Sequence, residues 1–283
     1  MNLAKLGSKL EQLIARLDGR AGIVLRVLET GEEWRYRSDE RFSAASIIKL
    51  PILWELLNAC RDGRLDLNGV VSVTRQHKVG GTGILKELHD GIEVTIRDLA
   101  TLMIVVSDNT ATNMIIDLLG FETINRAIDA LGLKGTALQR RMMDFEAKKA
   151  GKDNYTTPQD TATVLQQLAG DREAVDILLR QQLNNKLPKG LLVCPNCGRA
   201  VGDYPKCPWC YVDLRSNPPT GARLAHKTGE LAGVEHDAGI LLLEGKTLII
   251  VVMTSDLTSN DEGIRFIASV GSAIAEEALT GDR

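Results

Sequence analysis

The chain has 283 residues, 44% of them hydrophobic and 25% charged, and its 34 basic against 37 acidic side chains leave a formal net charge of -3. This length allows one large domain or two modest ones, with enough apolar residues to bury a core without a disulfide or a metal. The composition excludes intrinsic disorder, and the apolar runs are well short of the roughly 20 residues that cross a membrane. The charge provides no overall positive field, so no nucleic-acid partner is expected.

The first 20 residues predict an amphipathic helix. Leucine and isoleucine recur there at helical spacing, at positions 3, 6, 10, 13, 14 and 17. The segment lacks the basic region, apolar stretch and small-residue cleavage site of a signal peptide. We therefore expect a cytoplasmic protein, unless the sequence is a processed mature form.

After this helix the chain predicts two strands and a buried helix. Residues 22–28 are apolar and rich in branched side chains, and residues 33–37 alternate, with a glycine between the two runs. This pattern indicates a hairpin. Residues 45–60 follow helical spacing and are largely apolar. Pro51 removes a backbone donor inside that helix, so a slight kink is expected.

Capping signals predict three later helices: a buried helix that begins with a Thr95–Asp98 capping box, a helix over 158–167, and a last helix capped by Asn260. Another helix is expected to end near Asn185. Apolar runs predict central strands over 238–243 and 247–254. Strands from both ends of the chain are expected to share one antiparallel sheet flanked by the terminal helices. The central helices are expected to form a second, all-helical lobe. The sequence thus predicts an α/β fold of the α+β type.

Four of the five cysteines form two CxxC knuckles, Cys194 with Cys197 and Cys207 with Cys210. Two such knuckles aim four thiolates at one point, which suits a closed tetrahedral site. Zinc is the expected ion, with iron as the lesser alternative. A pair of disulfides is a weaker interpretation for a chain without an export signal. Cys60 has no partner in the pattern and is expected to be a core thiol.

The cysteines divide the chain. Residues 189–216 are predicted to be a zinc-ribbon-like insertion that folds around one structural ion. The main domain is then discontinuous, covering 1–188 and 217–283. Basic residues in the insertion are few, mainly Arg199 and Lys206. Contact with a protein, or shaping of a cleft rim, is therefore a better expectation for the module than nucleic-acid binding.

Three short motifs carry possible chemistry. Ser46 and Lys49 are three residues apart, so a helix would place both on one face, where a neutral lysine takes the serine proton. The helix N-terminus would stabilise developing negative charge nearby. Taken alone, this pair also describes a helix cap followed by a solvated lysine. The runs Ser107-Asp108-Asn109 and Lys227-Thr228-Gly229 describe, by themselves, a turn and a strand entry.

In this order, however, the three motifs resemble the active site of class A β-lactamases and penicillin-binding proteins. The resemblance extends to the Thr-x-Leu-x-Arg run at 136–140 and to the helix start at 156–158. It implies that Ser46 is the acylated nucleophile and Lys49 its proton acceptor. It also implies that Ser107 relays the proton to the leaving nitrogen and that Asn109 binds the side-chain amide of the substrate.

The resemblance assigns the remaining binding groups to the Lys227-Thr228-Gly229 strand and the residue after it. Lys227 would attract the substrate carboxylate and Thr228 would hydrogen-bond it. The backbone N–H groups of Ser46 and Glu230 would form the oxyanion hole. The family needs no cofactor for catalysis.

Some positions depart from the family pattern. Met142 stands where class A enzymes carry the glutamate that activates the deacylating water, and a thioether cannot accept a proton. Glu146, or Asp144, is a replacement only if the loop is reshaped. Asp153 is expected to pair with Arg140, because Tyr155 occupies the usual aspartate position.

Outside the motifs, His236 and Asp237 precede Ala238, where many enzymes of the resembled family place a carboxylate-binding arginine, so the anchoring of the carboxylate is expected to differ. His226 precedes Lys227 and is expected to be a packed or surface side chain on the opposite sheet face. The glycine-containing run 80–83 is expected to form a rim of the cleft.

These features favour a serine acyl hydrolase of the β-lactamase type that is acylated by β-lactams and deacylates slowly. One alternative is a peptidase or esterase, like the penicillin-binding proteins, with a substrate that is not a β-lactam. Another is a non-catalytic interaction protein that uses the zinc module. The intact motifs weigh against the latter, because a relic has no chemical reason to keep both lysines and both serines.

Overall fold

The computed structural model describes residues 1–194, 196–197, 206–213, 220–221 and 223–278. Its main sheet is antiparallel, with five strands in the order β2-β1-β11-β10-β9. The strands are β1 (Arg20–Val27), β2 (Glu33–Tyr36), β9 (Arg223–Leu231), β10 (Val234–Leu243) and β11 (Lys246–Ser255). Strand β1 pairs along its whole length with β11, from Arg20 opposite Ser255 to Val27 opposite Leu248. The expected sharing of one sheet by both ends of the chain is confirmed.

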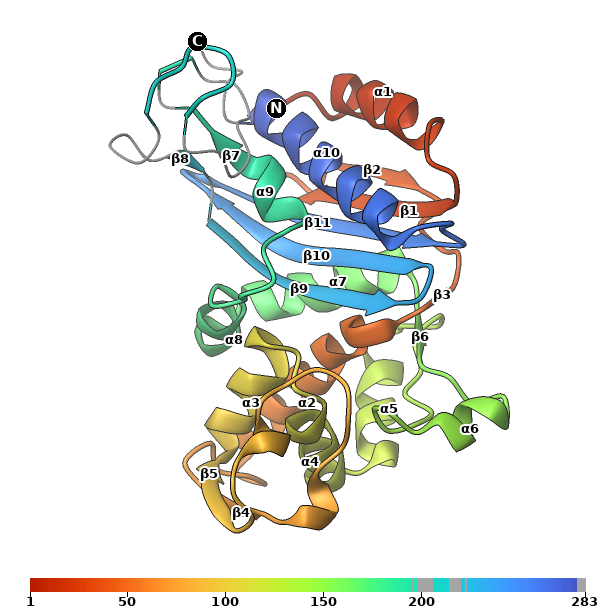
Figure 1. The fold of residues 1–283 in the computed structure, drawn as a ribbon, viewed down its shortest axis with the longest axis vertical. Helices are drawn as coiled ribbons and strands as arrows, with labels where there is room; N and C mark the ends of the chain where they lie inside the picture. The colour runs from red at the N-terminus through yellow and green to blue at the C-terminus, as the bar shows by residue number, and fades with distance from the viewer. Residues whose placement is uncertain (195, 198–205, 214–219, 222, 279–283) are drawn as a thin grey trace.

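Helices cover both faces of this sheet (Figure 1). On one face lie α1 (Leu3–Ile14), α9 (Leu187–Leu191) and α10 (Asn260–Ala278), and on the other lie α7 (Pro158–Ala169) and α8 (Arg172–Leu178). Each face has its own apolar core, because strands such as β1 are buried on both sides. No helix in the described ranges is long and apolar enough to span a membrane.

The remaining helices form a second lobe below the sheet in Figure 1. It contains a 3-10 turn (Ala45–Ile48), α2 (Lys49–Arg61), α3 (Ile96–Val105), α4 (Asn109–Leu119), α5 (Phe121–Ala130) and α6 (Phe145–Lys149). The small antiparallel pairs are β4 (Val70–Val73) with β5 (Ile92–Thr95), and β3 (Phe42–Ser43) with β6 (Tyr155–Thr156). One apolar core runs through this lobe to the underside of the sheet. The lobe and sheet therefore meet along a continuous packed boundary.

Two of the predicted helix details are confirmed and two are wrong. Thr95 and Asp98 form the expected capping box of α3, and α7 begins at the predicted proline. Pro51 does not interrupt a helix interior, since it lies in the first turn of α2, where N–H groups lack intrahelical partners anyway. Asn260 does not cap α10: its Oδ1 accepts the N–H of Gly233 at 3.0 Å, tying the helix start to the β9–β10 turn.

The first residues of the expected cysteine module pack with the main domain in this structure. The helix predicted to end near Asn185 ends at Leu178, and residue 189 lies inside α9, whose side chains Leu187 and Leu191 are buried in the main core. A Cβ on Gly190 would lie 2.0 Å from the carbonyl oxygen of Ala268, so α9 packs directly on α10. The module begins only after α9, at the paired stem strands β7 (Leu192–Val193) and β8 (Thr220–Gly221).

Candidate functional site

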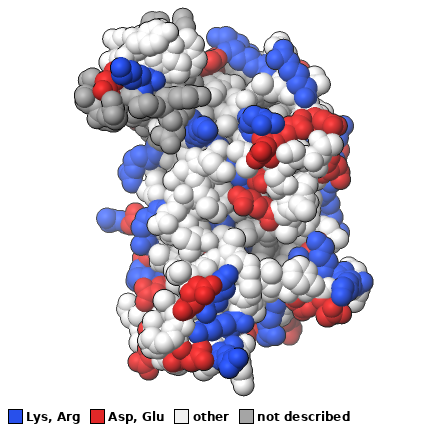
Figure 2. All heavy atoms as spheres, in the orientation of Figure 1, with Lys and Arg blue, Asp and Glu red and all other residues white. Residues whose placement is uncertain are grey.

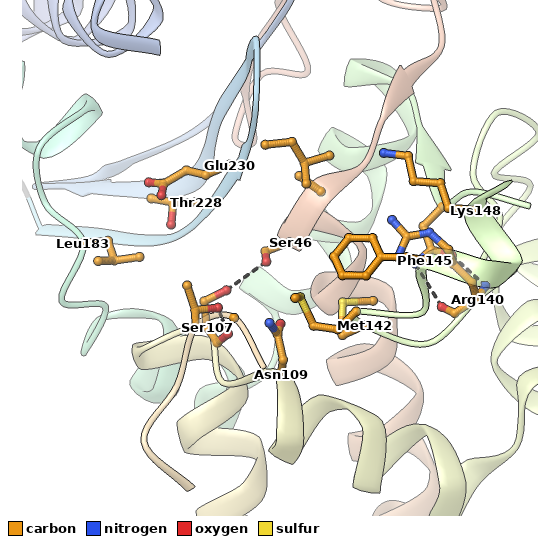
Figure 3. A pocket seen from close by; sticks show the side chains of 16 residues that line it. Ser46, Ser107, Asn109, Arg140, Met142, Phe145, Lys148, Leu183, Thr228 and Glu230 are labelled. Atoms are coloured by element: carbon orange, nitrogen blue, oxygen red, sulfur yellow. Dashed lines mark hydrogen bonds between the residues drawn. The ribbon is translucent and has the colours of Figure 1, made fainter. Parts of the chain in front are cut away.

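A cavity of about 320 Å³ lies where the helical lobe meets the edge strand β9 (Figure 3). It is lined by Ala45, Ser46, Gly81, Thr82, Ser107, Asn109, Arg140, Met142, Met143, Phe145, Lys148, Asn154, Leu183, Thr228, Glu230 and Leu231. All three predicted motifs contribute to this lining. The expected cleft-rim run supplies Gly81 and Thr82. Residues more than 180 positions apart therefore converge on one concave site.

Ser46 lies in the 3-10 turn that precedes α2, and its neighbours Ile47 and Ile48 are buried. These isoleucines hold the turn against the core and leave the Ser46 hydroxyl at the cavity. The Ser46 Oγ accepts a hydrogen bond from Ser107 Oγ at 2.9 Å. Ala45 has φ = 45°, an unusual backbone for a residue with a Cβ. The predicted nucleophile is thus presented by a strained turn, as functional residues often are.

Ser107 lies between α3 and α4 and also has a positive φ, of 54°. The next residue holds this bend: Asp108 caps α4 through Ala111 N–H and accepts the N–H groups of Ile84 and Leu85 at 2.7 and 2.8 Å. Asp108 is itself 1% exposed. A buried carboxylate with several backbone donors fixes both the bend and the loop across from it.

Lys49 is fully buried and points at Ser107. Its Nζ donates to Ser107 Oγ at 3.0 Å, to Ser107 O at 2.8 Å and to Asn109 Oδ1 at 3.1 Å. Burial lowers the pKa of Lys49 well below its usual value, and the charge of Lys227 lowers it further. The hydrogen bonds connect Lys49 to Ser46 through Ser107 Oγ. The expected transfer of the Ser46 proton to Lys49 stays a prediction, and this geometry offers it a path through one intermediate hydroxyl.

Lys227, in β9, completes the contacts of Ser107. Its Nζ donates to Ser107 Oγ at 3.1 Å and to Thr228 O at 2.8 Å. Burial lowers the pKa of Lys227 to about 7, and the charge of Lys186 contributes. Both motif lysines are thus held in surroundings that favour the neutral amine.

Gly229 allows β9 to approach the Ser46 turn closely. A Cβ at this position would lie 3.2 Å from Ile47 and 3.3 Å from Ala45, closer than side chains normally pack. The neighbouring residues Thr228 and Glu230 line the cavity. This close approach brings the backbone of Glu230 and that of Ser46 to the same cavity, as an oxyanion hole built from the two would require.

On the opposite wall of the cavity, the position at which class A enzymes carry the glutamate for hydrolysis is occupied by the apolar side chain of Met142. Met142 lines the cavity, and its backbone N–H and carbonyl are bonded to the Asn113 side chain at 2.8 and 3.1 Å. Phe145 lies beside it and is 56% exposed. The predicted pair of Arg140 with Asp153 is confirmed, with two contacts of 2.8 Å.

The structure does not place Glu146 at the cavity, where a replacement for the missing glutamate would have to lie. Its side chain is 85% exposed, pairs with Lys149 on α6, and does not line the cavity. Asp144 caps α6 by accepting the N–H of Ala147 at 2.9 Å. The helix α6 carries both carboxylates out of the site, because the cap fixes where the helix begins.

The two residues next to the position where the resembled enzymes carry an arginine are buried. His236 and Asp237 are 0% exposed, and burial lowers the pKa of His236 to about 4. Asp237 Oδ1 contacts His226 Nδ1 at 2.8 Å, so the packed alternative for His226 is confirmed. Neither His236 nor Asp237 reaches the cavity.

Three functional neighbours had no motif to mark them. Asn113 fixes Met142, and Asn154 accepts the N–H groups of Gln139 and Arg140 through one oxygen. Lys186 is fully buried and contacts Glu230. The sequence around Lys186 does not indicate that this lysine is buried, because its burial depends on strands that are 43 or more residues away in the chain.

The four knuckle cysteines cluster as expected. All four Sγ atoms lie within 4.8 Å of one another, and the pairs Cys194–Cys210 and Cys197–Cys207 are 3.6 Å apart. Tetrahedral ligands at about 2.3 Å from zinc would be about 3.8 Å apart, so the geometry fits a closed metal site. Of the two basic residues noted above, Arg199 lies outside the described residues, and the backbone of Lys206 forms an antiparallel β-bridge with that of Asp213.

Comparison with known proteins agrees with this geometry. The sequence model of the β-lactamase enzyme family matches residues 5–278. Beta-lactamase 1 of Streptomyces cacaoi is 25% identical over 280 residues, covering 92% of this chain and 80% of that protein. The crystal structure of β-lactamase from Sphaerobacter thermophilus superposes with a TM-score of 0.80 and 27% identity, covering 100% of both chains.

A second similar structure is that of PBP-A. It is 26% identical, has a TM-score of 0.79, and covers 98% of this chain and 97% of its own. A mutant of PBP-A has been solved as an acyl-enzyme complex with penicillin G. The matched family model covers most of the chain, cysteine segment included. The chain therefore belongs to the β-lactamase enzyme family.

Proposed function

We propose that the protein is a serine acyl-transfer enzyme that β-lactams acylate at Ser46 and that releases the acyl group slowly. The observation that carries the proposal is the hydrogen-bonded chain from Lys49 through Ser107 to Ser46 at the wall of the cavity. Acyl transfer needs a nucleophile, a nearby base and paired donors for the oxyanion. Ser46, Lys49 and the N–H groups of Ser46 and Glu230 are the candidates for these roles, and burial lowers the pKa of Lys49, which favours its neutral form.

In the acylation step, rotation of the two hydroxyl hydrogens lets Ser46 donate to Ser107 and Ser107 donate to neutral Lys49. The Ser46 oxygen then forms a bond to the substrate carbonyl carbon, and the developing oxyanion is bound by the N–H groups of Ser46 and Glu230. When the carbonyl–nitrogen bond breaks, Ser107 returns the proton to the leaving nitrogen. Ser107 suits this exchange because its Oγ contacts Ser46, Lys49 and Lys227.

Hydrolysis of the acyl-enzyme requires a base for the attacking water, and the wall that faces Ser46 supplies Met142 and Phe145. A thioether and a phenyl ring accept no proton. The acyl-enzyme should therefore accumulate. A peptidase or esterase with a substrate that is not a β-lactam would use the same acylation step and remains the second candidate, favoured by the similarity to PBP-A.

Mass spectrometry after incubation with penicillin G tests the proposal. We expect the mass of the antibiotic to be added to the peptide that contains Ser46, with a fast initial phase followed by slow turnover. Several β-lactams that leave Ser46 unmodified would overturn β-lactam recognition and leave the peptidase or esterase activity as the candidate.

The four cysteines support a separate proposal, that they bind one structural zinc ion, with no part in the acyl transfer. Four thiolates would hold the ion and exclude water from it, which leaves no open position for chemistry. Metal analysis of protein purified without added metal should give one zinc per chain. Iron in its place, or two disulfides, would contradict this assignment.

A further inference from the structure

We infer that Lys186 is a positioning residue for the acyl transfer: from the side of the sheet opposite Ser46, it holds and polarises the peptide group between Gly229 and Glu230, whose N–H is to bind the oxyanion. The inference rests on the proposed acylation of Ser46 and adds a residue to it. Two observations carry it: the backbone geometry of β9 at this peptide, and the contacts that one buried ammonium group makes there.

The Gly229–Glu230 peptide lies at the open edge of the sheet. Gly229 is opposite His236 of β10, and β9 is the last strand in the sheet order. Lys186 Nζ is 3.4 Å from Gly229 O and 3.3 Å from His236 O. One atom can reach both carbonyls only if they point between the strands, as in a hydrogen-bonded pair. The next N–H along β9, that of Glu230, then points away from β10, to the edge where the cavity lies.

The same ammonium group also holds the side chain of Glu230. Glu230 and Glu235 are opposite each other on β9 and β10. Lys186 Nζ is 3.0 Å from Glu230 Oε1 and 2.6 Å from Glu235 Oε2. Two consecutive residues of each strand are therefore tied to one cation, two through carbonyls and two through carboxylates. These contacts restrict the rotation of the Gly229–Glu230 peptide about the strand axis.

Lys186 makes these contacts from a fixed position. It is fully buried and directly precedes α9, whose Leu187 and Leu191 pack in the core that the sheet shares with α10. The N–H of Leu187 donates to Asp237 Oδ2 at 3.1 Å. In Figure 1, α9 lies on the face of the sheet that is turned away from the helical lobe. Lys186 therefore reaches the peptide from behind and does not line the cavity.

The position of the cation determines its effect on the peptide. A cation at the carbonyl end of a peptide group strengthens its N–H as a donor, because hydrogen bonds made by one group polarise one another. Donors that are oriented before the reaction contribute most to binding an oxyanion. Loss of a whole donor slows acyl transfer about 10²–10³-fold, so loss of the cation behind it should slow the step by about tenfold or more.

The charge of Lys186 acts inward. On the face drawn in Figure 2, acidic and basic side chains are interspersed around a broad uncharged area, and a fully buried lysine adds nothing to that surface. Inside, burial and then the charge of Lys186 lower the pKa of Lys227, whereas Asp237 and Glu230 act in the opposite direction. Lys49 faces Lys227 from α2 as a further cation. Lys186 thus affects both the Glu230 peptide and the lysine of the same strand.

The test uses the penicillin G acyl-enzyme of the full chain, made with antibiotic that carries an isotope label at the β-lactam carbonyl carbon. Lys186→Met alone leaves Glu235 buried without its cation, which can prevent folding. The main variant is therefore Lys186→Met combined with Glu235→Gln, and Glu235→Gln alone shows how much of any change comes from the glutamate. The matched control is Lys189→Met, which removes an exposed cation from the same helix.

Difference infrared spectroscopy of the labelled ester carbonyl reports the hydrogen bonds that the oxyanion hole donates to it. We expect the double variant to move this band to higher wavenumber. Its acylation rate constant at saturating penicillin should fall by about tenfold or more, with less change in the concentration that gives half the maximal rate. The decline of acylation with rising pH should also begin at a higher pH, because a cation that lowers the pKa of Lys227 is gone.

Lys189→Met should change none of these quantities, and circular dichroism establishes that each variant is folded. An unaltered carbonyl band and rate constant in the folded double variant would overturn the inference and leave Lys186 a structural residue. Equal effects of Glu235→Gln alone, which keeps Lys186, would overturn it as well. If penicillin G did not label Ser46 in the unaltered protein, the proposed acylation itself would be wrong, and the inference would fail with it.

Discussion

The two walls of the cavity differ in what they can do with a proton. On one wall, which we call the Ser107 wall, Ser107 Oγ contacts the hydroxyl of Ser46 and the amines of Lys49 and Lys227 within 3.1 Å. The other wall, which contains Met142 and Phe145, we call the Met142 wall. On this wall, the polar contacts that Met142 makes within the described part of the chain are those of its backbone with Asn113. Nucleophilic attack and hydrolysis are thus supported to very different degrees within one site. The proposed slow deacylation rests on this difference between the two walls, and the following experiments test it.

The largest effect should come from removing the nucleophile or the base of the Ser107 wall. Ser46→Ala removes the atom that is acylated and should abolish covalent labelling by penicillin. Lys49→Met keeps the buried volume but removes the base, and acylation should slow by about 10²–10⁴-fold. Stopped mixing followed by mass spectrometry measures the rate. Labelling of Lys49→Met at the original rate would show that another group takes the Ser46 proton.

The second prediction concerns the introduction of a general base for deacylation on the Met142 wall. Met142→Glu places a carboxylate at the cavity while Asn113 still holds the backbone, so deacylation should accelerate by about 100-fold or more, as expected of a general base. The lifetime of the penicillin acyl-enzyme measures it. Glu146→Gln, which alters an exposed side chain on α6, is the control and should not change that lifetime. A lifetime shortened by Glu146→Gln, or lengthened by it, would return Glu146 to the mechanism.

The pH dependence separates the two lysines of the Ser107 wall. Since the pKa of Lys227 is lowered to about 7, its charge is present below pH 7 and lost above it. Acylation by a carboxylate-bearing β-lactam should fall by about tenfold from pH 6 to pH 8, because the protonated fraction falls by that factor. The pKa of Lys49 is also lowered well below its usual value, by burial and by the charge of Lys227. A neutral thioester, used as the reference, should not show the decline.

The smallest effect should come from the cysteine module, which lies outside both walls. Replacement of residues 194–219 by a short turn keeps α9 and the β7–β8 stem, and acylation should change by less than about threefold. Zinc removal by a chelator should act equally weakly. Loss of acylation with the fold intact would instead assign the metal a role in catalysis.

A deletion that starts at residue 189 makes a sharper contrast. It removes Gly190, which lies against α10, and the buried side chain of Leu191. Loss of one buried leucine costs about 2–5 kcal/mol, so this version should unfold at much lower denaturant concentration. Circular dichroism against urea compares the two deletions. Equal stability would show that α9 is dispensable.

The sequence by itself determined the parts of this protein that are local in the chain. The hairpin of β1 and β2, the capping box at Thr95, the two CxxC knuckles and the three motifs all depend on spacings of a few residues. Such spacings fix helix faces, turns and caps, because the backbone has few conformations to choose from. The resemblance of the three motifs to a known active site then predicted that they lie together in the fold.

Only the tertiary structure decided which groups meet. Ser107 stands between Ser46 and Lys49, and Lys186 reaches Glu230 and Glu235, through contacts between residues 44 to 61 positions apart. Glu146 had a plausible place in the sequence, yet the Asp144 cap directs it to solvent. The pKa shifts of Lys49 and Lys227 arise in the same way, from desolvation by elements distant in the chain. Burial and charge proximity are properties of the packed core, and no local spacing encodes them.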